Sequence, residues 1–520
     1  MSSLEPRKKL PIGIQTFREI REEGYYYVDK TAFVLKLVEQ GKYYFLSRPR
    51  RFGKSLLIDT LAELFAANES LFTGLAIHKQ WDWQLKFPII RISFAEGVLS
   101  NEAALEQRIR EILSTEQQRH GINCRNQSIA GIFSELIESL HQKTGKRVVV
   151  LVDEYDKPLL DNLAHSDVAK AMRDGLRNLY SVIKGADAHI RFAMLTGVSK
   201  FSKVSLFSGL NNLNDITVDK KYSAICGYTD QDIDTVFLAE LEGLDRGKIR
   251  EWYNGYSWTG ESVYNPFDVL LLFNKRQFKS YWFETGTPTF LIELLASRQT
   301  WLPDLSRLES DADILSSFEL EYIPTEALMF QTGYLTIEEE KHDFGEYWYR
   351  LRYPNKEVYQ SLSNSLLRAW TSQASTQHVR QNKRQLQEIL KNNDFPAMQS
   401  LFTAFFASIP HDWYRKNPIA QYEGYYASVF YAYFAALGLA ITLEDSTNQG
   451  RIDMAVRYKQ QIYLFEFKVV ELSPKGTALQ QLKDKNYAEK YQSENEPIHL
   501  IGVEFSKEQR SVTGFEVVTL

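Results

Sequence analysis

Cysteine is scarce in this chain of 520 residues, which holds only Cys124 and Cys226. Two cysteines so far apart give neither a disulfide framework nor the ligand spacing of a zinc site. No apolar run approaches the length of a membrane span, and the opening residues, MSSLEPRKKLPIG, lack the apolar core of a signal peptide. The sequence therefore predicts a cytoplasmic protein without a membrane partner.

An excess of positive charge is also lacking, because 61 Lys and Arg stand against 66 Asp and Glu, for a net charge of -5. Any contact with nucleic acid must then come from local basic patches. The candidates are residues 380–386, the residues after Tyr414 and the segment around Gln481, although each alone also fits a solvated helix face. The length predicts about three domains, and 44% hydrophobic residues suffice for their cores.

Two strand-like runs near the C-terminus carry a compact set of charged residues. Asp453 lies in GRIDMAVRY, and Glu466 and Lys468 lie in QIYLFEFKVV. Side chains two apart on a strand share a face, so Glu466 and Lys468 should point one way while the flanking phenylalanines point the other. The carboxylates suit Mg2+, and the lysine could activate a water molecule. An amphipathic strand with two solvated charges would show the same alternation.

The surrounding elements give this pattern a family context. QYEGYYASVFYAYFAAL reads as a helix that starts near Glu423, and KGTALQQLKDKNYAEKYQ reads as a helix with Gln481 and Tyr487. The order of helix, strands and helix over about residues 400–520 resembles the PD-(D/E)xK nuclease superfamily, with Ile452 where the motif has proline. The resemblance implies that the catalytic positions are Glu423, Asp453, Glu466, Lys468 and Gln481, with metal held by Asp453 and Glu466. Tyr487 is expected to serve packing.

At the other end of the chain, KYYFLSRPRRFGKSLLIDTLAELF reads as a strand, a tight loop and a helix. Gly53 permits a close backbone approach, Lys54 can reach phosphates, and the Ser55 hydroxyl can join Mg2+ at the helix N-terminus. The usual first glycine of a phosphate-binding loop is replaced by Arg48. Arg50 and Arg51 add charge to the loop. A basic turn before an ordinary helix is the competing interpretation.

Two further apolar strands end in polar residues. KRVVVLVDEYDKP fits a strand buried on both faces that ends in Asp153 and Glu154, the pattern of a Walker B element. Asp153 would then hold Mg2+, and Glu154 would polarise the attacking water. HIRFAMLTGVSKFS is expected to present Thr196 or Ser199 to the γ-phosphate, and the sequence does not decide between them. Strands alternating with helices predict a parallel sheet.

The segments YVDKTAFVLKLVEQGKYYFLSRPRRFGKSLL, LVDEYDKP and LTGVSKFS, over about residues 10–215, are similar to a family of predicted bacterial AAA-like ATPases that carry such a nuclease domain. In that family RPRRFGKS is the usual loop. The resemblance continues through WYNGYSW, YNPFDVL, FETGTP and QTGYLTI. We expect the aromatic WYNGYSW cluster to serve packing and turn geometry.

These patterns predict an α/β multidomain chain. We assign residues 1–220 to a P-loop ATPase with a parallel sheet and residues 221–355 to a helical lid with a module that could be of winged-helix type. Residues 356–400 are expected to form a helical connector, and residues 401–520 an α/β PD-(D/E)xK nuclease-like domain.

The predicted function is an ATP-regulated, metal-dependent nuclease that cuts nucleic acid, with DNA favoured by the resemblance and defence against foreign DNA as a setting. The cofactors would be ATP and Mg2+, with Mn2+ as an alternative ion, and a homo-oligomer is one option. The nucleotide would be bound by Arg50, Arg51, Gly53, Lys54, Ser55, Asp153 and Thr196 or Ser199, with Ser55 and Asp153 on the metal and Glu154 catalytic. The alternative is a nucleotide-dependent sensor or scaffold whose nuclease-like domain binds without cutting.

Overall fold

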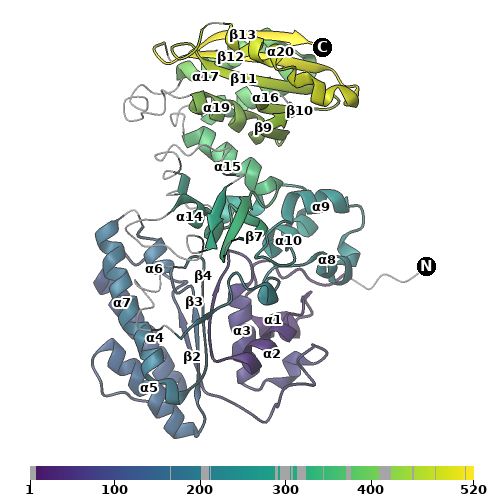
Figure 1. Cartoon of the computed structure of the whole chain (residues 1–520). Coiled ribbons are helices and arrows are strands. Elements are labelled where there is room, and N and C mark those ends of the chain that lie inside the picture. Colours follow the sequence, from purple (N-terminus) through teal and green to yellow (C-terminus); the bar gives the residue numbers. More distant parts are fainter. Residues whose placement is uncertain are drawn as a thin grey trace, which may run out of the picture. The chain divides into compact units, whose positions relative to one another are not determined.

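The computed structural model of the chain (Figure 1) describes residues 7–163, 165–200, 212–286, 308–312, 324–343, 345–369, 376–408, 423–447, 450–474, 476–509 and 511–520, with a few single positions between them. The chain forms two compact units. The first comprises Met1–Gly286 and Leu308–Asn355, and the second comprises Thr287–Arg307 and Lys356–Leu520.

The first unit is built on a parallel sheet. Its strands are β1(Tyr43–Ser47), β2(Ile89–Ser93), β3(Val148–Asp153), β4(Ile190–Gly197) and β5(Asn214–Asp215). They lie in the order β2-β3-β4-β1-β5, and every neighbouring pair is parallel. Every residue of β1 and β3 is buried, as expected for strands covered on both faces. Because all strands run the same way, the polar residues at their C-terminal ends gather at one edge.

Two groups of helices cover the two faces of this sheet (Figure 1). One group is α1(Phe17–Glu22), α2(Thr31–Gln40) and α3(Lys54–Phe65), and the other is α4(Glu102–His120), α5(Ile129–Thr144) and α7(Ser166–Gly185), with the short α6(Lys157–Leu160) after β3. Their ends follow from sequence. The side chains of Asn101 and Ser128 accept backbone hydrogen bonds at the N-termini of α4 and α5.

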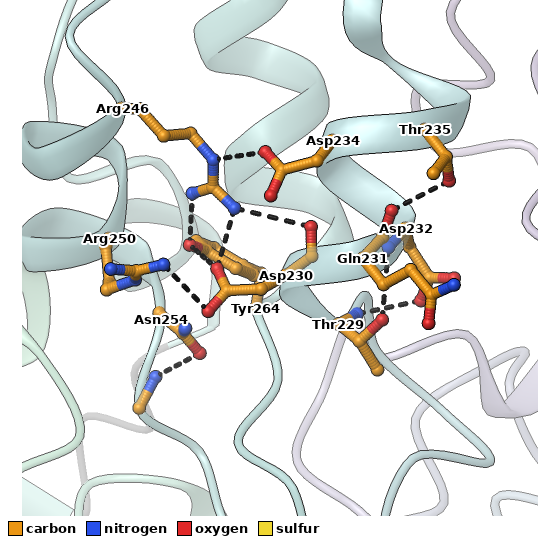
Figure 2. Close-up of polar contacts among 11 residues, drawn as sticks. Thr229, Asp230, Gln231, Asp232, Asp234, Thr235, Arg246, Arg250, Asn254 and Tyr264 are labelled. Carbon is orange, nitrogen blue, oxygen red and sulfur yellow. Dashed lines mark hydrogen bonds and ion pairs between the residues drawn. The ribbon is translucent and has the colours of Figure 1, made fainter.

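The following part of the first unit is helical. It contains α8(Asp230–Val236), α9(Arg246–Tyr253), α10(Pro266–Lys275), α11(Tyr281–Gly286) and α14(Thr325–Thr332). Figure 2 shows the polar contacts that join α8, α9 and the residues before α10. The Asp230 carboxylate accepts hydrogen bonds from Arg246 at 2.6 Å, from the Tyr264 hydroxyl at 2.7 Å and from Arg250 at 3.1 Å. One carboxylate therefore ties three segments together.

A small antiparallel sheet completes the first unit. Its strands are β6(Glu309–Asp311), β7(Thr336–Asp343) and β8(Glu346–Arg352), in the order β6-β8-β7, and β7 and β8 form a hairpin. The assignment of a winged-helix module to this region stays a prediction, as do the domain boundaries drawn from the sequence.

The second unit combines helices with a mixed sheet. The helices are α15(Lys356–Ala369), α16(Thr376–Asn392), α17(Phe395–Ser408), α19(Glu423–Ala436) and α20(Thr477–Asp484), and the strands are β9(Ala440–Thr447), β10(Gly450–Arg457), β11(Ile462–Val469), β12(Ile498–Ser506) and β13(Ser511–Thr519). The order is β13-β12-β11-β10-β9, with β11 and β12 parallel and the other neighbours antiparallel. The helices α15 and α16 fill the stretch expected as a connector.

Alternation along β11 separates the two faces of this sheet. Phe465 and Phe467 pack on Phe430 of α19, at ring distances of 6.2 and 5.2 Å. Helix α20 lies on the opposite face and approaches β12 so closely that a side chain at Gly502 would meet the backbone nitrogen of Leu479 at 2.3 Å. The faces that the sequence predicted for β11 are therefore the ones that the fold uses.

Short 3-10 helices occur at Glu69–Phe72, Asp187–His189, Lys220–Tyr222, Leu238–Glu240 and Tyr487–Glu494. The predicted fold class, an α/β multidomain chain with a parallel N-terminal sheet, a helical middle and a mixed C-terminal sheet, is confirmed. Among the described residues, no helix combines the length and the apolar character that a membrane span requires.

Candidate functional site

The first candidate site begins where β1 enters α3. The loop from Arg48 to Gly53 joins Ser47, the last residue of the strand, to Lys54, the first residue of the helix. Gly53 has a φ of 90°, in the left-handed region where a side chain is strained. The turn therefore requires glycine, and it leaves the N-terminus of a long helix available to an anion.

Lys54 is buried against its own loop. Its ammonium group donates hydrogen bonds to the carbonyl oxygens of Arg48 at 2.9 Å and Pro49 at 3.0 Å, and the residue is 6% exposed. Burial lowers the pKa of Lys54, and the charges of Asp153 and Glu154 act against that effect. A cation held among carbonyls and acids at this edge is placed to meet a phosphate group.

Asp153 and Thr196 lie together at the same edge of the sheet. The Thr196 hydroxyl donates to the Asp153 carboxylate at 2.7 Å, because β4 lies directly beside β3. The Ser199 hydroxyl instead donates to Asp156, at 2.6 Å. The two residues between which the sequence did not decide therefore contact different acids, and Thr196 is the one that accompanies Asp153.

Glu154 adopts an unusual backbone conformation, with a φ of 51° in a residue other than glycine. Its side chain is half-buried, and burial together with the Asp153 charge raises the pKa of its carboxyl group. Backbone strain of this kind costs about 1–3 kcal/mol and is concentrated at functional sites. The strained backbone and the raised pKa both indicate that Glu154 is a functional residue at the end of β3.

A cavity of about 580 Å³ opens beside these groups. This volume lies within the range of about 300–1,000 Å³ that small-molecule sites occupy. The polar part of its wall comes from Gln15, Arg50, Arg51, Gly53, Lys54, Ser55, Glu154, Lys157 and Asp161, and the apolar part includes Pro11, Ile14, Ile20, Tyr228, Pro266, Phe267 and Leu270. Such a cavity can receive a ligand with a charged end and an aromatic end.

Two residues of this region were not identified from the sequence as site residues. Asp156 is 1% exposed and accepts hydrogen bonds from the backbone of Val198 and from both the backbone and the hydroxyl of Ser199. Burial raises the pKa of Asp156, while the bonds from Ser199 act against the shift. Asp156 fixes the turn after β4, and the only signal for it was a third acid in LVDEYDKP.

Arg48 is the other such residue. It is fully buried and donates hydrogen bonds to the carbonyl oxygens of Ser47 at 2.9 Å, Thr217 at 2.7 Å and Tyr222 at 3.2 Å. Burial lowers the pKa of Arg48 to about 10. A common phosphate-binding loop has glycine at this position. Here the arginine joins the loop to distant parts of the chain, since Thr217 lies 169 residues later in the sequence.

The second candidate site lies in the second unit, on the face of its sheet that α20 covers. Asp453 of β10 accepts a hydrogen bond from the backbone nitrogen of Phe467, at 2.8 Å. This bond holds the aspartate beside β11, next to Glu466. Glu466 is fully buried, which is expensive for a carboxylate unless charged or polar partners surround it.

Two of the other predicted site residues contact Glu466. The Lys468 ammonium lies 3.2 Å from Glu466 Oε1, and the Gln481 side-chain amide donates a short hydrogen bond to the same oxygen. The Lys468 side chain is only 18% exposed. The structure thus brings Asp453, Glu466, Lys468 and Gln481 together from two strands and a helix.

Tyr487 joins this group through its hydroxyl. It is a core residue, 2% exposed, as the packing interpretation expects. Burial raises the pKa of its hydroxyl, and the nearby Gln481 side chain and Arg451 backbone act against that shift. A side chain at Gly450 would meet this hydroxyl at 2.6 Å, so the glycine of GRID is needed for the approach.

Glu423 begins α19, as the sequence predicted for its helix, but its side chain lies outside the described part. Among the described residues, no group of three or more His, Cys, Asp or Glu side chains is arranged to hold a metal ion. The donor set here is the pair Asp453 and Glu466. This pair fits Mg2+, which usually takes one or two protein carboxylates and completes its shell with water and phosphate oxygens.

Comparison with known proteins gives these two sites a family context. Residues 11–207 match the family described as "Predicted AAA-ATPase", and residues 421–514 match the "PD-(D/E)XK nuclease superfamily". A protein of Azotobacter chroococcum mcd 1, described as "Uncharacterized protein in vnfD 5'region", is 62% identical over 515 residues, which cover 99% of each chain. The two domain types imply the use of a nucleotide, a divalent metal ion and nucleic acid.

Proposed function

Because the chain belongs to the family of predicted AAA-ATPases with a C-terminal PD-(D/E)XK nuclease superfamily domain, we propose that it is an ATP-regulated, metal-dependent nuclease. The observation that carries the proposal is the buried Glu466 carboxylate with Lys468 and Gln481 on one of its oxygens and Asp453 beside it. A buried carboxylate in such company is costly for stability, and a catalytic role explains its presence.

In the cleavage step, Asp453 and Glu466 would hold the metal ion, which would supply charge stabilisation at the phosphate. Lys468 would orient or activate the attacking water, or stabilise the charge that develops on the phosphate oxygens. Gln481 would orient Glu466 through its amide, and the nearby Tyr487 hydroxyl would help to position Gln481. Glu423 would assist metal ligation or position water.

In the nucleotide site, Lys54 and the loop arginines Arg50 and Arg51 would bind the phosphates. Ser55 and Asp153 would hold Mg2+, and Glu154 would polarise the water that attacks the γ-phosphate. Thr196 is the better candidate to sense the γ-phosphate, since its hydroxyl reaches Asp153 while that of Ser199 is held by Asp156. We further propose that the nucleotide state sets the rate of cleavage, that DNA is the substrate, and that the protein acts in the cytoplasm against foreign DNA.

One experiment tests the proposal directly. The purified protein is incubated with plasmid, single-stranded DNA and RNA, each with and without Mg2+ or Mn2+ and with and without ATP. We expect cleavage that needs the divalent ion and is lost in Asp453→Ala, with ATP affinity unchanged. An Asp484→Ala variant, which changes an exposed acid of α20, is the matched control and should cut at the parent rate. Equal cleavage by Asp453→Ala protein free of contaminating nuclease would refute the assignment.

A second candidate function is a nucleotide-dependent sensor or scaffold whose C-terminal domain binds nucleic acid without cutting it. The observation that favours it is the arrangement of Glu466, because its Oε1 already accepts a hydrogen bond from Gln481 and faces Lys468, so these contacts alone can hold the carboxylate in place. The same assay separates the two functions. A sensor would retard nucleic acid in a gel and release no product with any of the ions.

A further inference from the structure

Helix α16 carries a stripe of basic residues. Arg380, Lys383, Arg384 and Gln387 recur at intervals of three and four, so they share one face of the helix. The neighbouring face is apolar, and its residues Leu386, Ile389 and Leu390 are buried in the second unit. The stripe therefore lies on another side of the helix from these apolar residues, with Arg380, Arg384 and Gln387 exposed and Lys383 partly buried.

This stripe forms one wall of a cavity of about 580 Å³. The cavity is lined by Gln360 of α15, by Arg380, Gln381, Lys383, Arg384 and Gln387 of α16, and by Ala436 and Leu437 at the end of α19. The lining thus holds three cations, three glutamines, no carboxylate and no aromatic ring. We call it the basic groove.

The positive charges of the basic groove repel one another. Arg380 and Arg384 are four residues apart and Lys383 lies between them, so like charges repel along one helix face. Within the described residues, no ion pair relieves them, whereas Lys391 on the same helix pairs with Glu388 at 2.5 Å. Lys383 donates instead to the neutral Asn364 at 2.7 Å. Burial, with the nearby charge of Arg368, lowers the pKa of Lys383 to about 8.

We propose that the basic groove binds the phosphodiester backbone of a nucleic-acid strand. An anionic ligand would remove the repulsion, and glutamine side chains donate hydrogen bonds to phosphate and sugar oxygens. A free nucleotide would also need a surface for its base, and the groove offers neither an aromatic platform nor an apolar pocket. The contact would therefore be independent of sequence.

The groove lies at the C-terminal end of the helix whose first residue, Glu423, is one of the proposed catalytic positions. Helix α19 begins at Glu423 and ends at Ala436, beside the groove. At a rise of 1.5 Å per residue, the two ends of the helix are about 20 Å apart. This distance corresponds to about six nucleotide steps of a duplex. The groove would hold the substrate on one side of the cut, and the inference in this form rests on the proposed nuclease function.

The test compares the full-length Asp453→Ala protein, which should bind without cutting, with the same protein carrying Arg380→Gln and Arg384→Gln. The matched control carries Lys391→Gln and Lys459→Gln, which remove two exposed positive charges elsewhere in the second unit. Affinity for a fluorescent DNA duplex is measured from about 50 to about 200 mM salt. We expect the double substitution in the groove to reduce the slope of log K against log salt by about 1.8 and the affinity by about tenfold or more, while the control matches the Asp453→Ala protein.

Each other outcome has a distinct meaning. An unchanged slope in the groove variant, with a parent protein that still binds and cuts DNA, overturns the groove and leaves the nuclease function standing. Inorganic phosphate and AMP are also tested as competitors of the fluorescent duplex. If either competes as strongly as an oligonucleotide at equal phosphate concentration, the groove does not bind a nucleic-acid strand. A parent protein that binds no nucleic acid at all overturns both the groove and the proposed function. Thermal unfolding midpoints of all variants establish that the fold is retained.

Discussion

The Arg48 guanidinium group lies 3.9 Å from the centre of the Trp258 ring. This contact joins the loop between β1 and α3 to the WYNGYSW segment, and it is one of several along the loop. Pro49 lies against Gly333, and Arg51 lies over the ring of Phe267. The Trp282 indole donates a hydrogen bond to the Arg50 carbonyl, and the Gly227 amide donates one to the Phe52 carbonyl. The outer side of the loop is therefore lined by Gly227, Trp258, Phe267, Trp282 and Gly333.

These contacts give the helical middle a physical role. A change in the loop conformation when nucleotide binds or is hydrolysed would alter the contacts of Trp258, Phe267 and Trp282, because each touches a different loop residue. The aromatic cluster that the sequence suggested for packing does pack, and one of its packing partners is Phe52, at 4.8 Å from Tyr256 and 5.6 Å from Trp258.

The first prediction concerns Arg48→Gly, which restores the glycine of the common loop signature. We expect it to lower the free energy of unfolding by about 3 kcal/mol and to weaken ATP binding, since three buried carbonyl groups lose their donor. Denaturant unfolding and nucleotide titration measure the two effects. Arg50→Gly is the contrasting variant, because Arg50 lines the cavity. This variant should bind ATP more weakly, with little change in the free energy of unfolding. Tighter ATP binding by Arg48→Gly would contradict the role given to Arg48.

The second prediction separates binding from hydrolysis at the nucleotide site. Lys54→Ala should weaken Mg-ATP binding, whereas Glu154→Gln should bind normally and hydrolyse about 100-fold more slowly or worse. The pKa of Glu154 is raised, and in the proposed mechanism its ionised form would be the active base. The parent hydrolysis rate should therefore rise with pH through that raised pKa, and the rate of Glu154→Gln should lack this rise.

Single-turnover hydrolysis across the pH range, together with direct titration of nucleotide, decides this point. Glu138→Gln, at an exposed position of α5, serves as the control and should follow the parent profile. Equal loss of ATP binding in Lys54→Ala and Glu154→Gln would instead give Glu154 a structural or metal-holding role.

The third prediction assigns a positioning role to the Tyr487 hydroxyl. Tyr487→Phe keeps the ring in the core but removes the hydroxyl that lies near Gln481. We expect cleavage at saturating substrate to slow by about tenfold, with a change of no more than about 1 kcal/mol in the free energy of unfolding. Tyr491→Phe is the matched control, because its hydroxyl bonds Asp445. A parent-like cleavage rate in Tyr487→Phe would leave the residue with packing alone.

The fourth prediction follows from Lys383. Its pKa in the folded protein is lowered to about 8, against about 10.4 for an unperturbed lysine. The unfolded chain binds more protons between these values, so this group makes stability rise with pH from about 8 to about 10, and its penalty is complete below pH 8. Lys383→Met should therefore raise the free energy of unfolding at pH 7 by about 1 kcal/mol, which allows for solvent screening of the charge. The same substitution removes a positive charge from the basic groove and should weaken DNA binding.

Denaturant unfolding at pH 7 and pH 10 measures this effect. The stabilisation by Lys383→Met should shrink at the higher pH, where the parent lysine is neutral. A variant that is destabilised equally at both values would show that Lys383 acts through packing, not through its charge.

The sequence was sufficient for elements whose signals are local. The alternation of β11 predicted which side chains reach the sheet face with Glu466, and the glycine, lysine and serine at the start of α3 predicted the loop. Arg48 could not be interpreted in this way, because its partners Thr217, Tyr222 and Trp258 are distant in sequence. The same holds for Tyr487, whose hydroxyl needs Gly450 to be free of a side chain.

The basic groove shows the same limit within one unit. The stripe on α16 could be read from the spacing of its residues, but such a stripe alone equally fits a solvated face. Gln360 and Ala436, which turn the stripe into a cavity, come from α15 and α19. Only tertiary packing brings these three helices together, so the sequence predicts the charge and the fold provides the concave shape.

Coupling between the two sites is the central claim, and the most direct measurement is the cleavage rate in each nucleotide state. Free Mg2+ is held constant while ATP, ADP and a non-hydrolysable ATP analogue are compared on the parent and on Lys54→Ala, with several DNA and RNA substrates. A coupling free energy of about 1–3 kcal/mol predicts parent rates that differ by about 5- to 150-fold between nucleotides, and a single rate for Lys54→Ala. Parent rates that do not differ among the three nucleotides on any substrate would contradict the claim.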